Sequence, residues 1–336
     1  RYVVDGNSFD GTWQNFYASS LNELSVARSI IEGDETVVGA ARVNQLAIID
    51  IMKTVSFQTL TELWGDVPYT EALNTEFPKP SYDTQADIWS DLLASLDASV
   101  ASIDVSGGSF VSGDIVYNGD MTAWKKLGAS LLLRMAMRVS DVDDAAASTY
   151  VGKAIGHGVL ESSADNAVFN FSSDPSTANP LYIDNVINNR DDFAVSEPLV
   201  TTLTAMGDPR LSVYAAPTNS DTIIGMPYGL TDPEAFALKD NTSRPATVRD
   251  ATSPHVFIDY AEVSFLLAEA VERGYTSGDA AEHYANGVTA SMNFWGFDDT
   301  AGAISDYIAA NPYDAANWKQ SLGMQKWIAF YSNGVQ

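Results

Sequence analysis

Helical periodicity is the feature that most constrains the fold of this 336-residue chain. Between residues 121 and 139, apolar side chains recur every three or four positions, at Trp124, Leu127, Leu131, Met135 and Val139. This spacing predicts a helix with one buried face. Asp120 stands where an N-cap is expected, and Arg134 and Arg138 lie towards the C-terminal end, where cations favour the helix dipole.

Similar spacing predicts helices over about 12–31, 38–63 and 144–156. Thr84 and Asp87 form a capping-box pattern ahead of an apolar series that starts at Ile88. Near the C-terminus, the helical patterns 261–274 and 280–296 are joined by the break YTSGD and predict a helical hairpin. Ala280 and Tyr284 have the spacing with which tetratricopeptide units pack one helix on the next. We therefore predict a mostly α-helical fold with a tetratricopeptide-like helical-repeat body.

The middle of the chain has a different character. Residues 158–259 are rich in Pro, Asn, Asp, Ser and Gly, with short pieces such as AVFNF (167–171) and LSVYAA (211–216) that resemble strands. The segment SFVSGDIVYNGD (109–120) has the turn residues of a small β-hairpin. We expect one domain over 1–336, helical in 1–157 and 260–336 and loop-rich in 158–259. Long irregular segments of this kind often carry binding surfaces.

The charge balance and the absence of cysteine exclude several classes of function. The chain has 18 basic and 44 acidic residues and a formal net charge of −26. Binding to nucleic acid or to anionic lipid requires clustered Lys and Arg, so neither is expected. Without cysteine there are no disulfides and no thiolate metal sites. No apolar run reaches the ~20 residues that span a bilayer.

Catalytic motifs are absent from the sequence. The three histidines are isolated, and there is no H-E-x-x-H zinc motif, G-x-S-x-G elbow, phosphate-binding loop or dinucleotide fingerprint. A glycosidase needs two carboxylates about 5–10 Å apart, but with 44 acids some pair fits any spacing, so such pairs carry no information. We expect no catalytic residues, no cofactor and no metal.

The stretch TELWGDVPYTEAL (61–73) marks a sharp change of direction. Gly65 and Pro68 follow a helical pattern that ends near Trp64. Trp64 and Tyr69 are then placed to pack beneath the bend. We interpret the stretch as a structural corner rather than a ligand-binding loop.

Seven segments resemble one known family. LWGDVPYTEAL (63–73) resembles the helix-ending corner of SusD-like (SusD/RagB) nutrient-binding proteins of Bacteroidota. The resemblance continues, in the order of the family, through GDMTAWKKLGASLLLRMAMRVSDVD (119–143), NPLY followed by DDFAVSEPLV (179–200), GDPRLSVYAAPT (207–218), GMPYGL (225–230), YAEVSFLLAEAVERGY (260–275) and QKWIAFYSNG (325–334). These segments are distributed over residues 63–334, so the resemblance extends over most of the chain.

The resemblance implies both a fold and a role. It implies a helical body of tetratricopeptide-like pairs with a loop-rich region over part of it. SusD-like proteins are lipoproteins on the extracellular face of the outer membrane. They bind a nutrient, usually a glycan, and act as the lid of a SusC-like TonB-dependent transporter. The expected partners are therefore that transporter, a glycan and the outer membrane, through a lipid anchor absent from this chain. A signal peptide, a lipidated N-terminal Cys and the C-terminal continuation of the family are also missing from the sequence, so both ends are expected to be incomplete.

Three alternatives remain open at this point. The same role with an oligopeptide ligand, as in RagB-like members, is the runner-up. A helical-repeat scaffold that binds only protein is a second possibility, and a hydrolase is the third. The absence of a catalytic motif favours the non-catalytic glycan-binding protein.

Candidate ligand-binding residues follow from the chemistry of sugars, which present apolar C–H faces and hydroxyl edges. Their sites combine flat aromatic rings with polar donors and acceptors. This combination occurs in Tyr182, Asn185, Arg190, Asp192 and Phe193, together with Trp13 at the start of the first helix and Tyr228 in a Pro-Tyr-Gly turn. Packing roles compete for Phe193 and Trp13, and Arg190 with Asp192 could be a surface ion pair. Four tryptophans on helical patterns are interpreted as core residues: Trp89, Trp124, Trp318 and Trp327.

Overall fold

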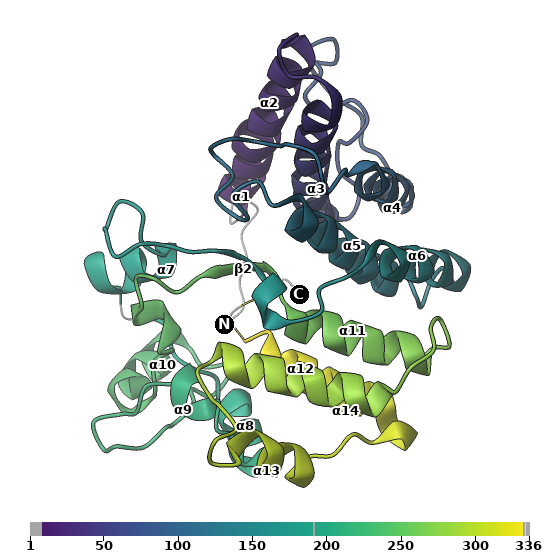
Figure 1. The fold of residues 1–336 in the computed structure, drawn as a ribbon. Helices are drawn as coiled ribbons and strands as arrows, with labels where there is room; N and C mark the ends of the chain where they lie inside the picture. Colours follow the sequence, from purple (N-terminus) through teal and green to yellow (C-terminus); the bar gives the residue numbers. More distant parts are fainter. Residues whose placement is uncertain (1–8, 191, 332, 334–336) are drawn as a thin grey trace.

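The computed structural model describes residues 9–190, 192–331 and 333, and the described chain is mostly helical, as predicted (Figure 1). The N-terminal half consists of α1 (Asp10–Gln14), the π-helical turn η1 (Asn15–Leu21), α2 (Asn22–Gly33), α3 (Gly39–Trp64), α4 (Gln85–Ser102), α5 (Met121–Arg138) and α6 (Asp144–His157). The predicted caps are confirmed: the Thr84 hydroxyl accepts a hydrogen bond from Asp87 N, and the Asp120 carboxylate accepts from Thr122 N and Ala123 N.

The rest of the chain divides into short elements and a second set of longer helices. The middle holds η2 (Ser163–Asp165), α7 (Pro180–Tyr182), the π-helical turn η3 (Ile183–Ile187), α8 (Glu197–Met206), α9 (Leu211–Tyr214), α10 (Asp232–Leu238), η4 (Lys239–Asn241) and η5 (Thr247–Arg249). The C-terminal part holds α11 (Tyr260–Glu272), α12 (Ala280–Phe294), α13 (Ala303–Ala310), η6 (Ala315–Asn317) and α14 (Trp318–Ala329). In Figure 1 α1–α6 form the upper tier, α8–α14 form the lower tier, and α5 and α6 lie over α11.

A small sheet joins two segments that are remote in sequence. β1 (Ala167–Phe169) pairs antiparallel with β2 (His255–Ile258), so the strand predicted in AVFNF is confirmed for its first three residues. The strand predicted in LSVYAA is wrong, because residues 211–214 form α9. Its start is fixed by Asp208, whose carboxylate accepts a hydrogen bond from Arg210 N at 3.0 Å, and Tyr214 N then bonds to Arg210 O.

The β-hairpin predicted at 109–120 is also wrong, since this segment consists of turns and irregular backbone. The Asp114 carboxylate accepts hydrogen bonds from the backbone N–H groups of Val116, Tyr117 and Gly119, and from Trp124 Nε1 at 2.7 Å. The three backbone N–H groups bond to the Asp114 side chain and so do not form the ladder of a β-hairpin. The four bonds also hold the pKa of Asp114 below its usual range despite its partial burial.

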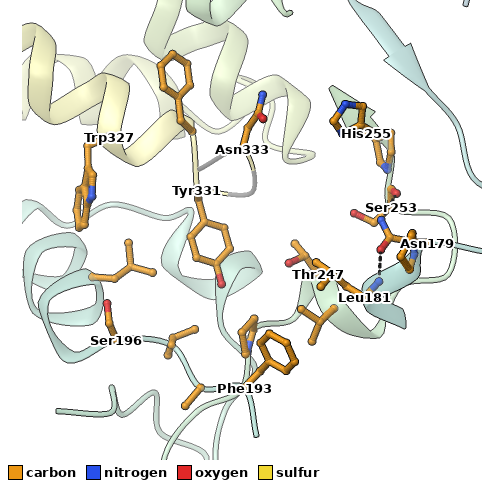
Figure 2. Close-up of a pocket in the computed structure, with 18 of the residues that line it drawn as sticks. Asn179, Leu181, Phe193, Ser196, Thr247, Ser253, His255, Trp327, Tyr331 and Asn333 are labelled. Carbon is orange, nitrogen blue, oxygen red and sulfur yellow. Dashed lines mark hydrogen bonds between the residues drawn. The ribbon is translucent and has the colours of Figure 1, made fainter. Parts of the chain in front are cut away.

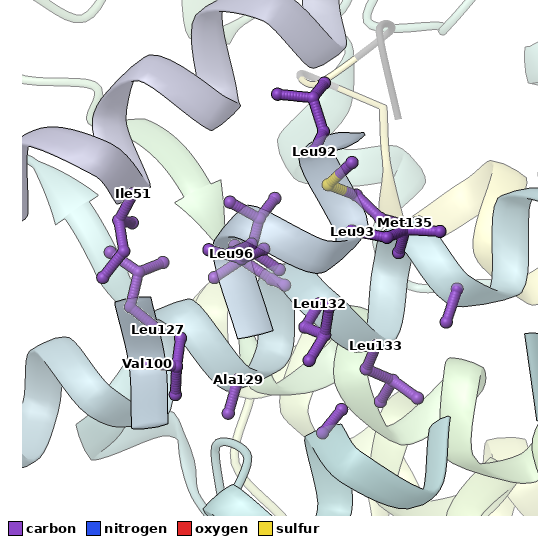
Figure 3. Packing of buried hydrophobic residues seen from close by; sticks show 14 of the residues in the cluster. Ile51, Leu92, Leu93, Leu96, Val100, Leu127, Ala129, Leu132, Leu133 and Met135 are labelled. Atoms are coloured by element: carbon purple, nitrogen blue, oxygen red, sulfur yellow. The ribbon is translucent and has the colours of Figure 1, made fainter. Parts of the chain in front are cut away.

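The main hydrophobic core lies between α3, α4, α5 and α6, and extends to α11. Figure 3 shows residues of α4 and α5 interdigitating, with Ile51 of α3 beside them. Gly128 allows this close approach, because a Cβ atom there would lie 2.5 Å from Val100 Cγ2 and 3.0 Å from Ile51 Cδ1. Trp89 and Trp124 are buried in this core, which confirms their interpretation.

The C-terminal helices pack around a second core. Ala280 and Tyr284 are both buried in it, so the predicted packing of α12 on α11 is confirmed. Gly287 brings the two helices together, since a Cβ there would come within 2.6 Å of the Phe265 ring. Trp318, at the start of α14, is only half-buried, with the Arg273 guanidinium 5.6 Å above its ring.

Two buried arginines tie the tiers and the C-terminal helices together. Arg134 of α5 donates to both carboxylate oxygens of Glu262 on α11, each at 2.6 Å, and to Phe257 O at 2.6 Å. Arg210 donates to both Asp208 oxygens at 2.9 and 2.6 Å, to Ser291 Oγ and to Gln325 Oε1. The side chains of Arg210 and Asp208 are completely inaccessible to solvent, with 0% exposure each.

The corner at 61–73 is structural, as interpreted. α3 ends at Trp64, and Gly65 turns the chain with a φ of 75°. The Tyr17 hydroxyl donates to Pro68 O at 2.7 Å, and the Tyr69 ring lies edge-on to Phe57 at 4.7 Å. These contacts attach the corner to η1 and α3. Within the described residues, no helix combines the length and apolarity needed to cross a membrane.

Candidate functional site

A cavity of about 980 Å³ opens between the loop-rich segment and the C-terminal end of α14. Its walls come from three parts of the chain: residues 171–199, 228–255 and 323–333. Figure 2 shows Trp327 and Tyr331 on one side, Asn179, Ser253 and His255 on the other, and Phe193 between them at the bottom of the view. The volume is at the upper end of the ~300–1,000 Å³ typical of ligand pockets.

The first wall is built on the start of α7. Asn179 Oδ1 accepts a hydrogen bond from Leu181 N at 2.9 Å and thereby caps the helix, while Pro180 takes the first helical position. Asn179 Nδ2 donates to Ser253 O at 2.8 Å, which ties this wall to the segment before β2. The NPLY motif therefore fixes one side of the cavity, and the Asn179 amide already has protein partners on both atoms.

The second wall is formed by residues of the segment 193–199 together with Tyr228. The backbone that precedes Tyr228 pairs with the segment 195–197. Met226 N donates to Val195 O at 2.7 Å, and Glu197 N donates to Met226 O at 2.9 Å. A Cβ atom at Gly225 would lie 2.4 Å from Glu197 Cα and 2.6 Å from Glu197 N. Gly225 is therefore the residue that lets this pair of segments approach and that places Tyr228 at the cavity.

Gly225→Ala tests this placement. Because the Cβ would meet backbone rather than a movable side chain, we expect a loss of about 1–3 kcal/mol in the free energy of unfolding, with the 225–228 segment displaced. Chemical denaturation measures the loss. Gly33→Ala is the matched control, since a Cβ there meets nothing within 4 Å. Equal stability of the two variants would contradict the assigned role of Gly225.

The third wall is aromatic. The Tyr331 ring stacks on Tyr214 with centroids 4.2 Å apart and an interplanar angle of 8°, and its hydroxyl donates to Tyr214 O at 2.9 Å. Burial raises the pKa of Tyr331 to about 12, so the phenol is neutral at physiological pH. Trp327 differs: it is 46% exposed and lines the cavity, so its interpretation as a core residue is wrong. It directly precedes the buried Ile328 on α14 and therefore faces roughly 100° away from the core.

The described lining of the cavity contains no Asp or Glu, although the chain has 44 of them. Its titratable groups other than tyrosine are Lys326, whose Nζ lies 3.5 Å from Glu269 Oε2, and His255. The His255 residue is exposed overall, yet its ring packs edge-on to Phe257 at 4.9 Å, and the partial loss of water lowers its pKa. A neutral imidazole both donates and accepts hydrogen bonds, which suits a hydroxyl-rich ligand.

Two of the predicted site residues, Phe193 and Tyr228, line the cavity. Tyr228 is 65% exposed at the opening, and Phe193 is half-buried with the Arg190 guanidinium 5.7 Å from its ring. Arg190 forms a two-point ion pair with Asp192, at 3.2 and 2.5 Å, on the exposed surface beside Phe193. The guanidinium is thus held next to the cavity without lining it.

The other predicted residues are not among the residues that line the cavity. Asn185 Nδ2 donates to Leu181 O at 3.0 Å within the helical turn, and Tyr182 is half-buried on α7 next to the lining residue Leu181. Trp13 is not part of the lining. It packs with Tyr17 at 4.9 Å, edge-on to Trp64 at 5.3 Å and nearly parallel to Tyr82 at 6.4 Å, in the aromatic cluster of the corner.

Sequence reasoning missed Trp327, His255 and Lys326 as lining residues. The aromatic spacing Trp327, Phe330 and Tyr331 fits one face of a helix, and this pattern does not distinguish a core from a cavity wall. His255 and Lys326 carry no local signal. In residues 9–190, 192–331 and 333, no three His, Asp or Glu side chains gather in a way that could hold a metal ion.

Comparisons with known proteins agree with this architecture. A family model described as starch-binding and associating with the outer membrane, of the SusD-like type, matches residues 1–336. A chitin-binding protein of solved structure is 31% identical with a TM-score of 0.87, over 99% of this chain and 75% of its own. No curated protein matches the sequence.

Two more distant structures share the fold. A chitin-binding SusD homologue from Flavobacterium johnsoniae is 23% identical with a TM-score of 0.83, over 99% of this chain and 74% of its own. A SusD homologue from Bacteroides vulgatus is 22% identical with a TM-score of 0.84, over 99% and 73% of the two chains. With the family model matching every residue and the helical architecture in agreement, the chain belongs to the SusD-like family.

Proposed function

We propose that this protein is a non-catalytic glycan-binding protein and that the cavity of about 980 Å³ holds the sugar chain. The observation that carries the proposal is the combination of exposed aromatic rings with described lining residues that include no Asp or Glu. Trp327 and Tyr228 both line this cavity and are 46% and 65% exposed to solvent. Aromatic faces pack against the C–H faces of pyranose rings, and the Ser196, Thr247 and His255 side chains offer polar groups for hydroxyls.

The same lining argues against hydrolysis in this cavity. Glycoside hydrolysis normally uses an acid and a second carboxylate on the two sides of the scissile bond. Asp and Glu are missing from the described lining residues. The chitin-binding protein that is 31% identical supports a polysaccharide ligand, since it covers 99% of this chain.

The proposal also includes the location of the protein and what it does with the bound glycan. Family membership supports a protein on the extracellular face of the outer membrane, anchored by a lipid, that delivers its ligand to a SusC-like TonB-dependent transporter and closes over it as a lid. The transporter interface should be large and partly polar, as expected for a lid that opens. Purification of the native protein from detergent-extracted outer membranes should bring down a much larger β-barrel. A lone chain after such a purification would argue against the pairing.

Titration calorimetry with soluble oligosaccharides, including chitin and starch fragments, tests ligand binding. We expect saturable heat with one glycan class and no shorter products after incubation. Heat only with a mixed peptide digest would identify an oligopeptide ligand instead. Product formation would contradict the non-catalytic assignment.

Trp327→Ala tests the cavity itself. Loss of the exposed ring should weaken glycan affinity about 10- to 50-fold, or ~1.4–2.3 kcal/mol, with little change in thermal stability because the side chain is 46% exposed. Trp327→Phe should recover part of the affinity, since it restores a flat ring. Phe77→Ala is the matched control, because Phe77 is 42% exposed and lies outside the cavity lining. Unchanged affinity in Trp327→Ala would place the ligand elsewhere.

A further inference from the structure

A second, smaller cavity of about 260 Å³ is lined by more basic than acidic residues, although the chain as a whole is acidic. We call it the basic pocket; it is lined by residues 216–219 together with Lys239, Asp240, Thr242, Arg244 and Arg249. Three of these nine lining residues are cations and one is an acid. In the chain as a whole, 44 acids outnumber 18 bases. Such a concentration of positive charge in a protein of net charge −26 indicates an attraction for anions.

We refer to the cavity of about 980 Å³, proposed above to hold the sugar chain, as the glycan cavity. The basic pocket and the glycan cavity share one wall, residues 244–249. Pro245, Thr247 and Val248 line the glycan cavity, whereas Arg244 and Arg249 line the basic pocket. Ala216 N donates to Arg244 O and Ala246 N donates to Tyr214 O, both at 2.9 Å, and Pro245 forms an isolated bridge with Ala215. This strand-like pairing directs successive side chains to opposite sides, which explains why Arg244 and Pro245 face different cavities.

Arg249 marks the boundary between the two cavities. It ends η5, is exposed, and directly follows Val248, a buried residue of the glycan cavity lining. A polymer that leaves the glycan cavity over this boundary therefore passes the basic pocket. Polysaccharides are long enough to do so, whereas a single sugar is not.

The groups in the basic pocket suit an oxoanion. Guanidinium groups match the geometry of carboxylate, sulfate and phosphate oxygens and form charge-assisted hydrogen bonds with them. Lys239 adds an ammonium group, held with its Nζ 4.6 Å above the Phe236 ring. The Thr218 hydroxyl and the Asn219 amide supply further polar groups. Thr242 is buried, and its hydroxyl donates to Leu238 O at 3.2 Å, so it closes the pocket rather than facing a ligand.

We infer that the basic pocket binds the negatively charged group, a carboxylate or a sulfate ester, of an acidic glycan whose sugar rings occupy the neighbouring cavity. The inference rests on the proposed function, because it assumes that the glycan cavity holds a sugar chain. Among the residues that the structure describes, none that lines that cavity is an acid, which is compatible with an anionic polymer. Salt screens the negative charges elsewhere on the surface beyond about 10 Å, so the contacts within the pocket dominate.

The test uses glycans that differ only in charge. Affinity is measured for oligogalacturonate and its methyl ester, and for a sulfated oligogalactan and its desulfated form, with inorganic sulfate as the probe for a free anion. The double variant Arg244→Gln with Arg249→Gln removes two charges from the pocket. Lys79→Gln with Lys125→Gln is the control, since it changes the net charge equally and neither lysine lines either cavity. The exposed Arg249→Gln alone serves if the double variant is unstable.

We expect one acidic glycan to bind at least about tenfold more tightly than its uncharged form, and the double variant to lose this preference while it keeps its affinity for the uncharged form. The control should keep the preference. Equal affinity for charged and uncharged forms would overturn the inference and leave the proposed glycan function intact. Sulfate binding that depends on the two arginines, with no glycan bound by the protein, would overturn both the glycan source of the anion and the proposed function. If the control lost the preference for the charged glycan to the same extent, the effect would come from net charge, and the assignment of the anion site to the basic pocket would be wrong.

Discussion

Arg210→Met is expected to lower the free energy of unfolding by about 3–5 kcal/mol, because it leaves the Asp208 carboxylate buried without its cation. Asp208 and Arg210 both have 0% side-chain exposure, so water cannot replace the lost bonds. The change also strips Ser291 and Gln325 of the guanidinium that they contact at 2.9 Å. Equilibrium denaturation measures the loss.

The double variant Asp208→Asn with Arg210→Met separates the buried charge from the lost contacts. Without the stranded carboxylate, it should be more stable than Arg210→Met alone. Arg190→Met is the matched surface control, since Arg190 and Asp192 are 51% and 56% exposed and such pairs contribute about 0–1 kcal/mol. A loss in Arg210→Met no larger than in Arg190→Met would show that the buried pair is not a main stabilising contact.

Arg134→Met should have a similar cost of about 3–5 kcal/mol, and this cost should depend on pH. Arg134 is the bidentate partner of Glu262, and both side chains are 4% exposed. It also faces Asp259, the N-cap of α11, whose pKa is raised to about 6 mainly by burial and partly by the charge of Glu262, with Arg134 opposing the rise. Removal of Arg134 therefore leaves two carboxylates without their nearby cation.

The sign of the pH effect follows from the raised pKa of Asp259. Its folded-state pKa of about 6 lies above the unfolded value of about 3.9, so the folded protein holds this proton more tightly. Stability linked to Asp259 is present below about pH 4 and is lost as the pH rises through about 6. Without Arg134 the folded pKa rises further, so the deficit of Arg134→Met should be larger at pH 7 than at pH 5. A deficit that is equal at both pH values in denaturation experiments would contradict the coupling.

Local signals in the sequence were sufficient for the long helices before residue 158 and for α11 and α12, but not for α8, α9 and α10 in the segment predicted to be loop-rich. Thr84 and Asp120 cap helices through bonds that span two or three residues, so a short window of sequence contains the whole interaction. The packing of Ala280 and Tyr284 follows from helical spacing in the same way. The segment 109–120 shows the limit: its turn residues suggested a hairpin, but the Asp114 carboxylate takes the backbone donors and reaches Trp124 on the next helix.

The candidate site was accessible to sequence reasoning only in part. Phe193 and Tyr228 were predicted because they lie in polar loops, where an aromatic residue stands out. Trp327 and Trp124 both lie on helical apolar patterns, yet one is 46% exposed and the other 2%. What distinguishes them is the neighbour that each helix face meets. That neighbour is set by tertiary structure, since α14 meets segments from residues 171–199 and 228–255.

The assembly of the glycan cavity from three distant segments couples ligand binding to the folding equilibrium. Opening of any one segment removes a wall of the cavity, so the unfolded chain cannot bind the ligand there. A ligand at 100 times its dissociation constant would then add about 2.7 kcal/mol to the stability of the chain through mass action. Glycans can therefore be screened by the rise in melting temperature alone. The capture of nutrient would also protect the protein from proteases that act on opened states.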